Sequence, residues 1–310
     1  MQCRSPQPFY FAWGCFRHFS FGPVTTLFAC VALMVSALPA HAEPLKVIAS
    51  FSILGDFVRN VGGDRVDVTT LVGPDSDAHV YAPTPRDAKR IAEARLIVVN
   101  GFGFEGWLPR LVQSSGSKAT VVTATDGITP LRRGSDADPH AWQAVDNAKV
   151  YVANIRVALA AADPAGSEQF RANGDAYLAK LGALDREVRS AVAQIPAARR
   201  KVISTHNAFG YFASAYGIEF VAPLGVSTES EPSARDIAGI ITQIKQARIP
   251  AVFLENVSDP RLIQRISAET GAKVGGTLYS DSLTGEKGDA PTYIDMVRHN
   301  IKALTSALAN

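Results

Sequence analysis

Four histidines follow residue 42 of this 310-residue chain, and no cysteine does. They are His79, His140, His206 and His299. Without thiols, a tight site for a divalent metal has to be built from imidazole nitrogens and carboxylate oxygens. The same composition excludes a thiolate metal site, a catalytic cysteine and a disulfide framework from the chain after residue 42.

Three of these histidines stand in polar turns that follow predicted strands: His79, His140 and His206. Asp281 stands in a fourth such turn, shortly after a predicted strand over 273–278. One histidine in such a loop is more often a capping or surface residue than a ligand, so a metal site requires several of these loops to converge. In open parallel sheets, ligands gather outside the carboxyl ends of the strands. Three imidazoles and one carboxylate then close a crevice between the two halves of the chain, a tetrahedral set that suits zinc.

The elements that must position these residues alternate between strand and helix. Alternation of this kind predicts parallel sheets with helices on both faces. The predicted strands are 45–51, 66–72, 96–100 and 120–123 in the first half, and 201–204, 220–222, 251–255 and 273–278 in the second. The predicted helices are 53–61, 85–94, 146–162, 209–216, 233–247, 260–270 and 293–308. The fold class is therefore α/β, with two parallel-sheet domains and a metal cleft between them.

A long helix is predicted to join the two domains. Asp163 and Pro164 supply an N-cap and a first-turn proline, and no further proline occurs before Pro196. Apolar residues from Phe170 to Ile195 recur at helical intervals and form one stripe. We predict a rigid helix over 164–195, roughly 48 Å long at about 1.5 Å per residue.

The first 42 residues have the features of a secretory signal peptide. Arg4 and Arg17 precede an apolar run over 24–38, and Ala40-His41-Ala42 is a small-residue cleavage pattern. An uncleaved membrane anchor and a lipid anchor on Cys30 are the alternatives, but the run is short for a bilayer span and Cys30 lies inside it. Cleavage leaves 29 basic and 29 acidic residues, which argues against a nucleic-acid surface. The predicted location is the periplasm.

The length after cleavage is near the point at which single cores divide into domains. We therefore predict four parts. They are a signal peptide over 1–42, an N-terminal α/β domain over 43–145, connecting helices including the long helix over 146–196, and a C-terminal α/β domain over 197–310.

Five ordered motifs make the sequence resemble a known family. They are Asp77-Ala-His-Val-Tyr-Ala-Pro-Thr-Pro-Arg-Asp87, Asp138-Pro-His-Ala-Trp142, Thr205-His-Asn-Ala-Phe-Gly-Tyr-Phe-Ala-Ser-Ala-Tyr-Gly217, Glu231-Pro-Ser233 and Leu278-Tyr-Ser-Asp-Ser282. Together they resemble the periplasmic zinc/manganese-binding proteins of metal-uptake ABC transporters. The resemblance runs in order along the whole chain after the signal peptide.

The resemblance implies two α/β domains joined by a rigid long helix, with one metal in the cleft. It places the ligands at His79, His140, His206 and Asp281. Glutamate at the third position goes with manganese and histidine more often with zinc, so His206 favours zinc. Many zinc members carry a His-rich loop before the second ligand, whereas residues 127–138 contain no histidine. A metal-collecting loop is therefore not expected.

The function implied is capture of Zn(II) in the periplasm and delivery to the permease of a high-affinity ABC importer, which a cytoplasmic ATPase drives. Manganese or iron in the same role is the alternative. The protein is then a monomer and not an enzyme. A zinc hydrolase is the rival from another class, but it needs an open fourth position, which Asp281 fills, and no H-E-x-x-H motif occurs. An adhesin role has weaker support, because the sequence has no repeats.

Three further residues each have two interpretations. Glu255, at the end of a predicted strand, either accepts from a ligand imidazole or caps the turn over 256–260. Trp142 either shields the metal from water or is ordinary core. His299 is predicted to lie on the solvated face of the last helix rather than to bind metal.

Overall fold

Eight strands form two four-stranded sheets in the computed structural model, which describes residue 14 and residues 43–309. The first sheet contains β1 (Leu45–Phe51), β2 (Val66–Val72), β3 (Leu96–Val99) and β4 (Thr120–Thr123), and the second contains β7 (Lys201–Ile203), β8 (Glu219–Val221), β9 (Ala251–Glu255) and β10 (Lys273–Leu278). Their orders are β2-β1-β3-β4 and β10-β9-β7-β8, and every neighbouring pair is parallel. The predicted α/β class with two parallel sheets is confirmed. The predicted signal peptide lies outside the described residues, apart from Gly14.

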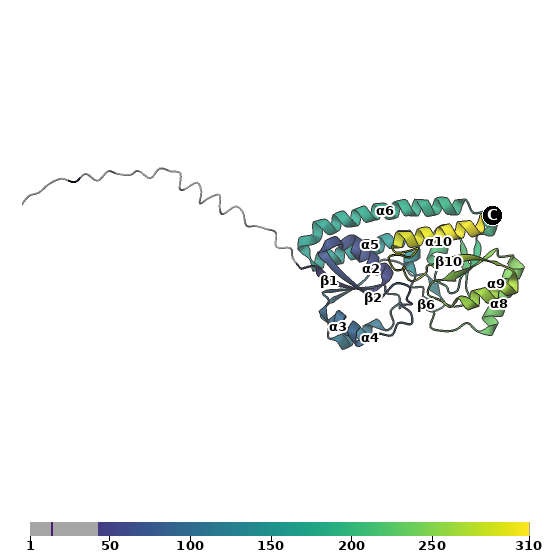
Figure 1. Ribbon diagram of the computed structural model, residues 1–310, viewed down its shortest axis with the longest axis horizontal. Coiled ribbons are helices and arrows are strands. Elements are labelled where there is room, and N and C mark those ends of the chain that lie inside the picture. The colour runs from purple at the N-terminus through teal and green to yellow at the C-terminus, as the bar shows by residue number, and fades with distance from the viewer. Residues whose placement is uncertain (1–13, 15–42, 310) are drawn as a thin grey trace, which may run out of the picture. The chain divides into compact units, whose positions relative to one another are not determined.

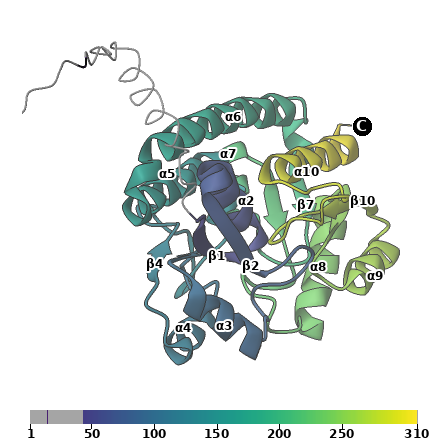
Figure 2. The same ribbon diagram turned by 60° about the vertical axis from the view of Figure 1, so that its left-hand side comes forward.

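Helices cover both faces of each sheet (Figures 1 and 2). The first sheet packs against α2 (Ser52–Gly62) and α5 (Val145–Ala162) on one face and against α3 (Pro85–Glu93) and α4 (Leu108–Ser115) on the other. The second sheet packs against α7 (Gly210–Tyr216) and α10 (Tyr293–Leu308) on one face and against α8 (Ala234–Ala247) and α9 (Pro260–Thr270) on the other. Short 3₁₀ helices lie at Gly63–Arg65, Ala141–Gln143, Pro164–Gly166 and Ala197–Arg199.

Strand β1 shows how the sequence builds these layers. Successive side chains of a strand point to opposite faces of its sheet. Val47, Ala49 and Phe51 accordingly enter the core beneath α2 and α5, whereas Ile48 packs with Ile91 of α3 on the opposite face. A strand that is apolar on both faces therefore has to lie in the middle of the sheet, as β1 does.

One hydrophobic core extends through both sheets. It joins Phe51 of the first sheet and Phe253 of the second through Trp142, Leu181 and Tyr293, all of which are buried. Residues 43–310 accordingly form one compact unit. The predicted domain boundaries within this unit stay a prediction.

The helix α6 (Ser167–Ala193) is 27 residues long, shorter than the sequence predicts. Residues 164–166 form a 3₁₀ turn, and the Asp163 side chain caps no helix. Its carboxylate instead accepts from Arg65 Nε at 2.8 Å, because an arginine across the fold competes for it. In Figure 1, α6 runs along the molecule beside α5 and α10, and it contacts both helices.

A small hairpin precedes His140 and was not predicted. It pairs β5 (Arg132–Arg133) with β6 (Asp136–Ala137) in antiparallel fashion. The hydroxyl of Tyr211 on α7 accepts from Leu131 N at 3.0 Å and donates to Asp138 O at 2.8 Å. This contact fixes both ends of the hairpin against α7, and so fixes the chain that leads to His140.

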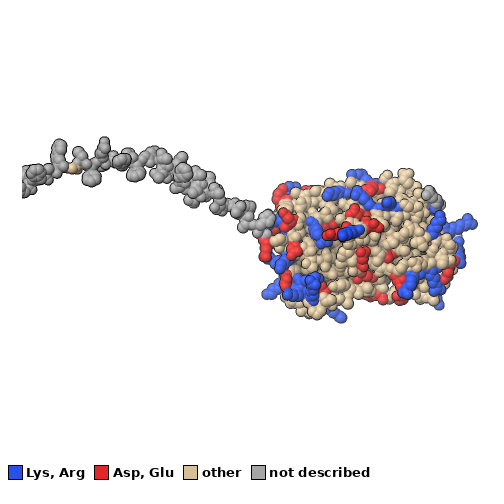
Figure 3. All heavy atoms as spheres, viewed as in Figure 1, with Lys and Arg blue, Asp and Glu red and all other residues tan. Residues whose placement is uncertain are grey.

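The surface carries charges of both signs. Basic and acidic side chains are interspersed over the face shown in Figure 3, in keeping with the balanced charge of the sequence. In the described part of the chain, no helix has both the length and the apolar character needed to cross a bilayer.

Candidate metal centre

The four predicted ligands meet at one point of the structure, with their potential ligand atoms all within 4.8 Å of one another. His79 lies in the loop after β2, His206 follows β7 and Asp281 follows β10, as the sequence predicts. The placement of His140 differs, because it follows the hairpin strand β6 and not a strand of either four-stranded sheet. Asn100, just past β3, donates from Nδ2 to Pro139 O at 2.9 Å and so ties this segment to the first sheet.

Close contacts join five of the six pairs of residues in the cluster. His140 Nε2 lies 3.3 Å from His79 Nε2 and 3.4 Å from His206 Nε2. The Asp281 oxygens lie 3.4 Å from His79 Nε2, 3.4 Å from His140 Nε2 and 3.1 Å from His206 Nε2. Ligands about 2.0–2.1 Å from a central zinc ion form a tetrahedron with edges of about 3.3–3.4 Å. The five contacts are close to this length, so the size of the cluster fits one zinc ion at its centre.

Asp281 is buried without a hydrogen-bond partner. Its side chain has no exposed surface, and within the described residues neither carboxylate oxygen accepts a hydrogen bond. Removing a carboxylate from water is costly unless hydrogen bonds or a cation compensate for the loss. Around Asp281 the available compensation is the set of three imidazoles, or a cation held between them and the carboxylate.

Two carboxylates orient the imidazoles from behind. Asp138 Oδ1 lies 2.8 Å from His140 Nδ1, and Glu255 Oε2 lies 2.6 Å from His206 Nδ1. The Glu255–His206 contact is short but does not have the geometry of a hydrogen bond, and neither of its two atoms has another hydrogen-bond partner in the described part of the chain. A carboxylate next to Nδ1 favours the tautomer with the proton on Nδ1, which leaves the Nε2 lone pair for a metal. Both Nε2 atoms accordingly face the centre of the cluster.

The charges of the cluster perturb its titration. Burial lowers the pKa of His140, but the carboxylates of Asp281 and Asp138 outweigh it and raise that pKa above its ordinary value. Burial likewise lowers the pKa of His206. The charges of Glu255 and Asp281 outweigh burial and raise this pKa well above its ordinary value. For Asp281, burial raises the pKa, and the opposing charges of His206 and His140 hold it well below the usual range.

Glu255 has both a structural and an electrostatic role. Its Oε1 accepts from Thr205 N at 2.7 Å and from His206 N at 3.0 Å, while Oε2 faces the imidazole of His206. The interpretation of Glu255 as a partner of a ligand imidazole is therefore supported by geometry. Within the described residues, the Glu255 side chain forms no hydrogen bond with the turn over 256–260.

We expect Glu255→Gln to weaken metal binding about 10- to 100-fold, the usual cost of losing a group that orients a metal ligand. The amide cannot accept from both backbone N–H groups and also favour a proton on His206 Nδ1. Either the turn shifts or the imidazole adopts the tautomer with its proton on Nε2, where it blocks the metal. Competition titration against a chelator measures the effect, with the exposed Glu187→Gln as control. Equal affinity in the two variants would contradict the assignment.

Aromatic rings seal the inner side of the cluster. Trp142 is fully buried, donates from Nε1 to Ser280 O at 2.9 Å and lies 5.2 Å from the ring of His140. Phe104 packs edge-on against His79 at 4.7 Å. Trp142 therefore belongs to the core and also excludes water from His140. The two interpretations of Trp142, as a core residue and as a shield against water, are compatible.

Sequence reasoning did not assign roles to Asp138 and Phe104. A signal for Asp138 existed, because an aspartate stands two residues before both His79 and His140. In each case its Oδ1 accepts from the histidine N, at 2.8 Å for Asp77 and 3.0 Å for Asp138. Phe104 has no comparable local pattern.

His299 lies outside the cluster. Its Nε2 is 3.0 Å from Thr277 O, and its ring packs against Tyr279 at 4.8 Å. The predicted solvated position is wrong in part, because the side chain is half-buried against β10.

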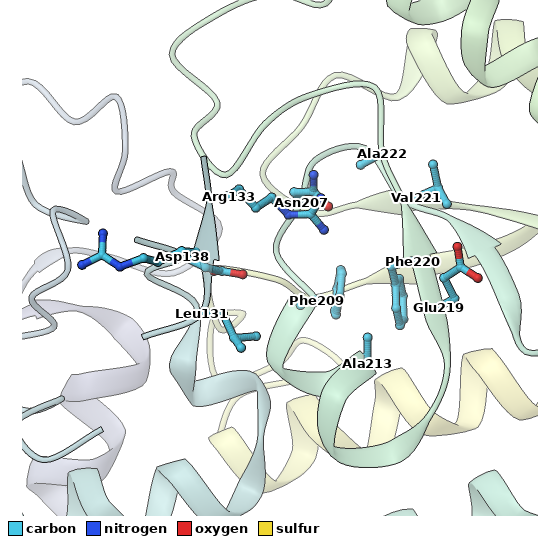
Figure 4. A pocket seen from close by; sticks show the side chains of 12 residues that line it. Leu131, Arg133, Asp138, Asn207, Phe209, Ala213, Glu219, Phe220, Val221 and Ala222 are labelled. Carbon is cyan, nitrogen blue, oxygen red and sulfur yellow. The ribbon is translucent and has the colours of Figure 1, made fainter. Parts of the chain in front are cut away.

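A cavity of about 490 Å³ lies beside the cluster (Figure 4). The hairpin residues Leu131 and Arg133 form one wall, and the stacked rings of Phe209 and Phe220 form another. Asp138 is shared between this cavity and the cluster, but none of the four predicted ligands lines it. The cavity is therefore distinct from the metal centre.

Comparison with known proteins agrees with the fold and identifies the family. Residues 47–307 match the family described as "Zinc-uptake complex component A periplasmic". The chain is 36% identical to the iron-binding protein YfeA of Yersinia pestis, over 90% of this chain and 91% of that protein. It is also 36% identical to the manganese-binding lipoprotein MntA of Halalkalibacterium halodurans, over 86% of this chain and 89% of that protein.

A solved structure gives the same result. The periplasmic zinc-binding protein TroA of Treponema pallidum superposes with a TM-score of 0.83 at 30% identity, covering 86% of this chain and all of that one. The resemblance drawn from the five motifs is confirmed. Members of the family bind substrate for ABC transporters and are not enzymes, which removes the hydrolase alternative. The chain thus belongs to the family of periplasmic metal-binding components of ABC transporters described as zinc-uptake complex component A.

Proposed function

We propose that this protein captures Zn(II) through His79, His140, His206 and Asp281 and delivers it to the permease of an ABC importer. The observation that carries the proposal is the convergence of three imidazole nitrogens and one carboxylate, in which five of the six residue pairs approach to 3.1–3.4 Å and all ligand atoms lie within 4.8 Å of one another. Zinc has no geometric preference from its d electrons and is usually four-coordinate with nitrogen and oxygen ligands.

The relatives leave the choice of metal open, because their names refer to iron, manganese and zinc. The donor set of this chain favours zinc. Three imidazoles are softer donors than the carboxylates and waters that manganese prefers, and the Irving–Williams order also places zinc above manganese and iron. Both considerations act in the same direction at this site.

The remaining parts of the proposal concern the whole protein. We propose that a signal peptide over 1–42 is removed and that the chain then acts as a monomer. We also propose that residues 43–145 and 197–310 act as two domains joined by residues 146–196. The membrane partner is a permease with its ATPase, as for the relatives that are named as ABC transporter components.

The experiment that tests the function is a measurement of metal content and affinity. Protein purified from periplasm should contain one zinc ion per chain, and competition with a chromophoric chelator should rank zinc above manganese and iron(II). Protein that carries one manganese or iron ion instead would correct the choice of metal. Protein that binds none of the three would overturn the proposal.

His206→Glu should narrow the preference for zinc over manganese by about tenfold or more. A carboxylate at this position offers harder oxygen donors and binds through one or two atoms, which suits a higher coordination number. Zinc binding should weaken, although the Irving–Williams order still predicts a higher affinity for zinc than for manganese. Paired titrations with both metals at one pH measure the ratio, with His299→Glu as a control for the same change outside the cluster. An unchanged ratio would show that His206 does not select the metal.

A further inference from the structure

A loop of the second half connects two of the histidine-bearing loops. Residues 222–233, here named the bridging loop, run between β8 and α8 without regular secondary structure. Hydrogen bonds link this loop to the residues on both sides of His206, and one further bond links it to the loop that carries His79. It is therefore placed to couple the positions of two ligands that are far apart in the sequence.

The link to His206 is made by backbone atoms. Leu224 N donates to Thr205 O at 3.3 Å, and Asn207 N donates to Gly225 O at 2.9 Å. These two bonds flank His206 in the sequence, so the bridging loop follows the backbone that carries this imidazole.

The link to His79 is made by side chains. Thr228 Oγ1 donates to Asp77 Oδ2 at 2.6 Å, across 151 positions of sequence. The other oxygen, Asp77 Oδ1, accepts from His79 N at 2.8 Å. One carboxylate therefore holds the backbone of His79 with one oxygen and the bridging loop with the other. Hydrogen bonds to a charged acceptor are roughly twice as strong as neutral ones.

His79 is also the ligand nearest to solvent. It is 8% exposed, whereas His140, His206 and Asp281 have no exposed surface. The first ligand to leave a metal in a closed site is the one that has room to move outward. Contacts that restrain His79 should therefore act mainly on the rate of metal release.

We propose that Thr228 is a positioning residue for metal retention, which holds His79 in the site through Asp77 and so sets the lifetime of the bound metal. The inference rests on the proposed function, because it takes the four clustered residues as the metal ligands. Thr228 contributes no ligand atom to the cluster. Its loss should thus leave the donor set intact and shorten the residence time.

Release of zinc from the full mature chain into excess chelator, followed by stopped flow, tests this role. Thr228→Val removes the hydroxyl at nearly constant volume and should accelerate release about tenfold, which is about 1.4 kcal/mol. Thr228→Ser keeps the hydroxyl and should release zinc within about twofold of the wild-type rate, a rescue not expected from a purely steric role. Thr242→Val makes the same change on the exposed part of α8 and should leave the rate unchanged.

A second variant keeps the test sharp if Thr228→Val is poorly folded. Asp77→Ala should accelerate release at least as much as Thr228→Val, and combining the two should add nothing further, because both break one connection. Additive effects of the two substitutions, or release from Thr228→Val at the wild-type rate, would overturn the inference. The proposed function would still stand if His79→Ala weakened zinc binding by at least about tenfold. Failure of the wild type and His79→Ala to differ would overturn the proposed function instead.

Discussion

Asp281→Ala is expected to weaken zinc binding by at least a hundredfold, which corresponds to about 2.7 kcal/mol. The variant loses a ligand and also the one negative charge that faces all three imidazoles at 3.1–3.4 Å. Without it, the metal carries its double charge into a buried site with neutral donors alone. Alanine at His79, His140 or His206 removes one nitrogen donor and should weaken binding by at least tenfold.

Competition titration with a chelator of known affinity measures these losses, and circular dichroism establishes that each variant is folded. Asp289→Ala is the matched control, because Asp289 is exposed on the loop that follows Asp281. The assignment is wrong if Asp281→Ala stays within threefold of this control. Wild-type affinity in two of the three histidine variants would equally exclude the cluster as the site.

Zinc affinity should fall steeply as the pH drops from about 7.5 to 5.5. The pKa values of His140 and His206 are raised by neighbouring carboxylates, so protons compete for both imidazoles already above the ordinary value of about 6.5. Once both are protonated, each further pH unit costs about a hundredfold in affinity, because two protons leave for each metal bound. The pKa of Asp281 is lowered, so this carboxylate stays ionised throughout.

Titration at several pH values, together with calorimetry in buffers of different ionisation enthalpy, gives both the affinity and the number of protons released. The logarithm of the zinc affinity should change by about two per pH unit. Asp138→Asn should lower this slope, because the raised pKa of His140 depends in part on Asp138. A flat profile would mean that carboxylates dominate metal binding.

The metal-free protein should show a different dependence of stability on pH. Since the pKa values of His140 and His206 are raised in the folded state, the stabilisation they give is full below about pH 6.5 and is lost as the pH rises through the raised values. The lowered pKa of Asp281 gives stabilisation that is present above about pH 3.9 and is lost below it. The cluster should therefore contribute most to the stability of the metal-free protein at mildly acid pH, where zinc binding is weakest.

Local sequence patterns predicted the elements and the cluster for a clear physical reason. Strands such as Leu45–Phe51 and Ala251–Glu255 carry their apolar signal within a few consecutive residues. In a parallel sheet, the direction of each strand then decides the edge at which the next loop lies. This rule brought His79, His206 and Asp281 together before any contact was known.

What the sequence did not predict depends on distant partners. The two-residue strands of the β5–β6 hairpin are too short for a periodic pattern, and Tyr211 holds the hairpin from 80 positions away. Asp163 looks like a helix cap, but Arg65 binds it across 98 positions. The bond between Thr228 and Asp77 likewise joins residues that no local pattern relates.

The segment that follows Asp281 has a consequence for the order in which the protein folds. Leu283 N donates to Ser52 Oγ at 2.9 Å, and Asp75 N donates to Leu283 O at 2.9 Å, so this segment packs on the start of α2 and on the loop after β2, both more than 200 positions earlier in the sequence. Contacts of such separation form late, because a long stretch of chain must be ordered first. The loop that carries His79 therefore forms its backbone hydrogen bond with Leu283 only after almost the whole polypeptide has been made. A chain that ends before Asp281 would lack both the last predicted ligand and the segment that holds the loop of the first.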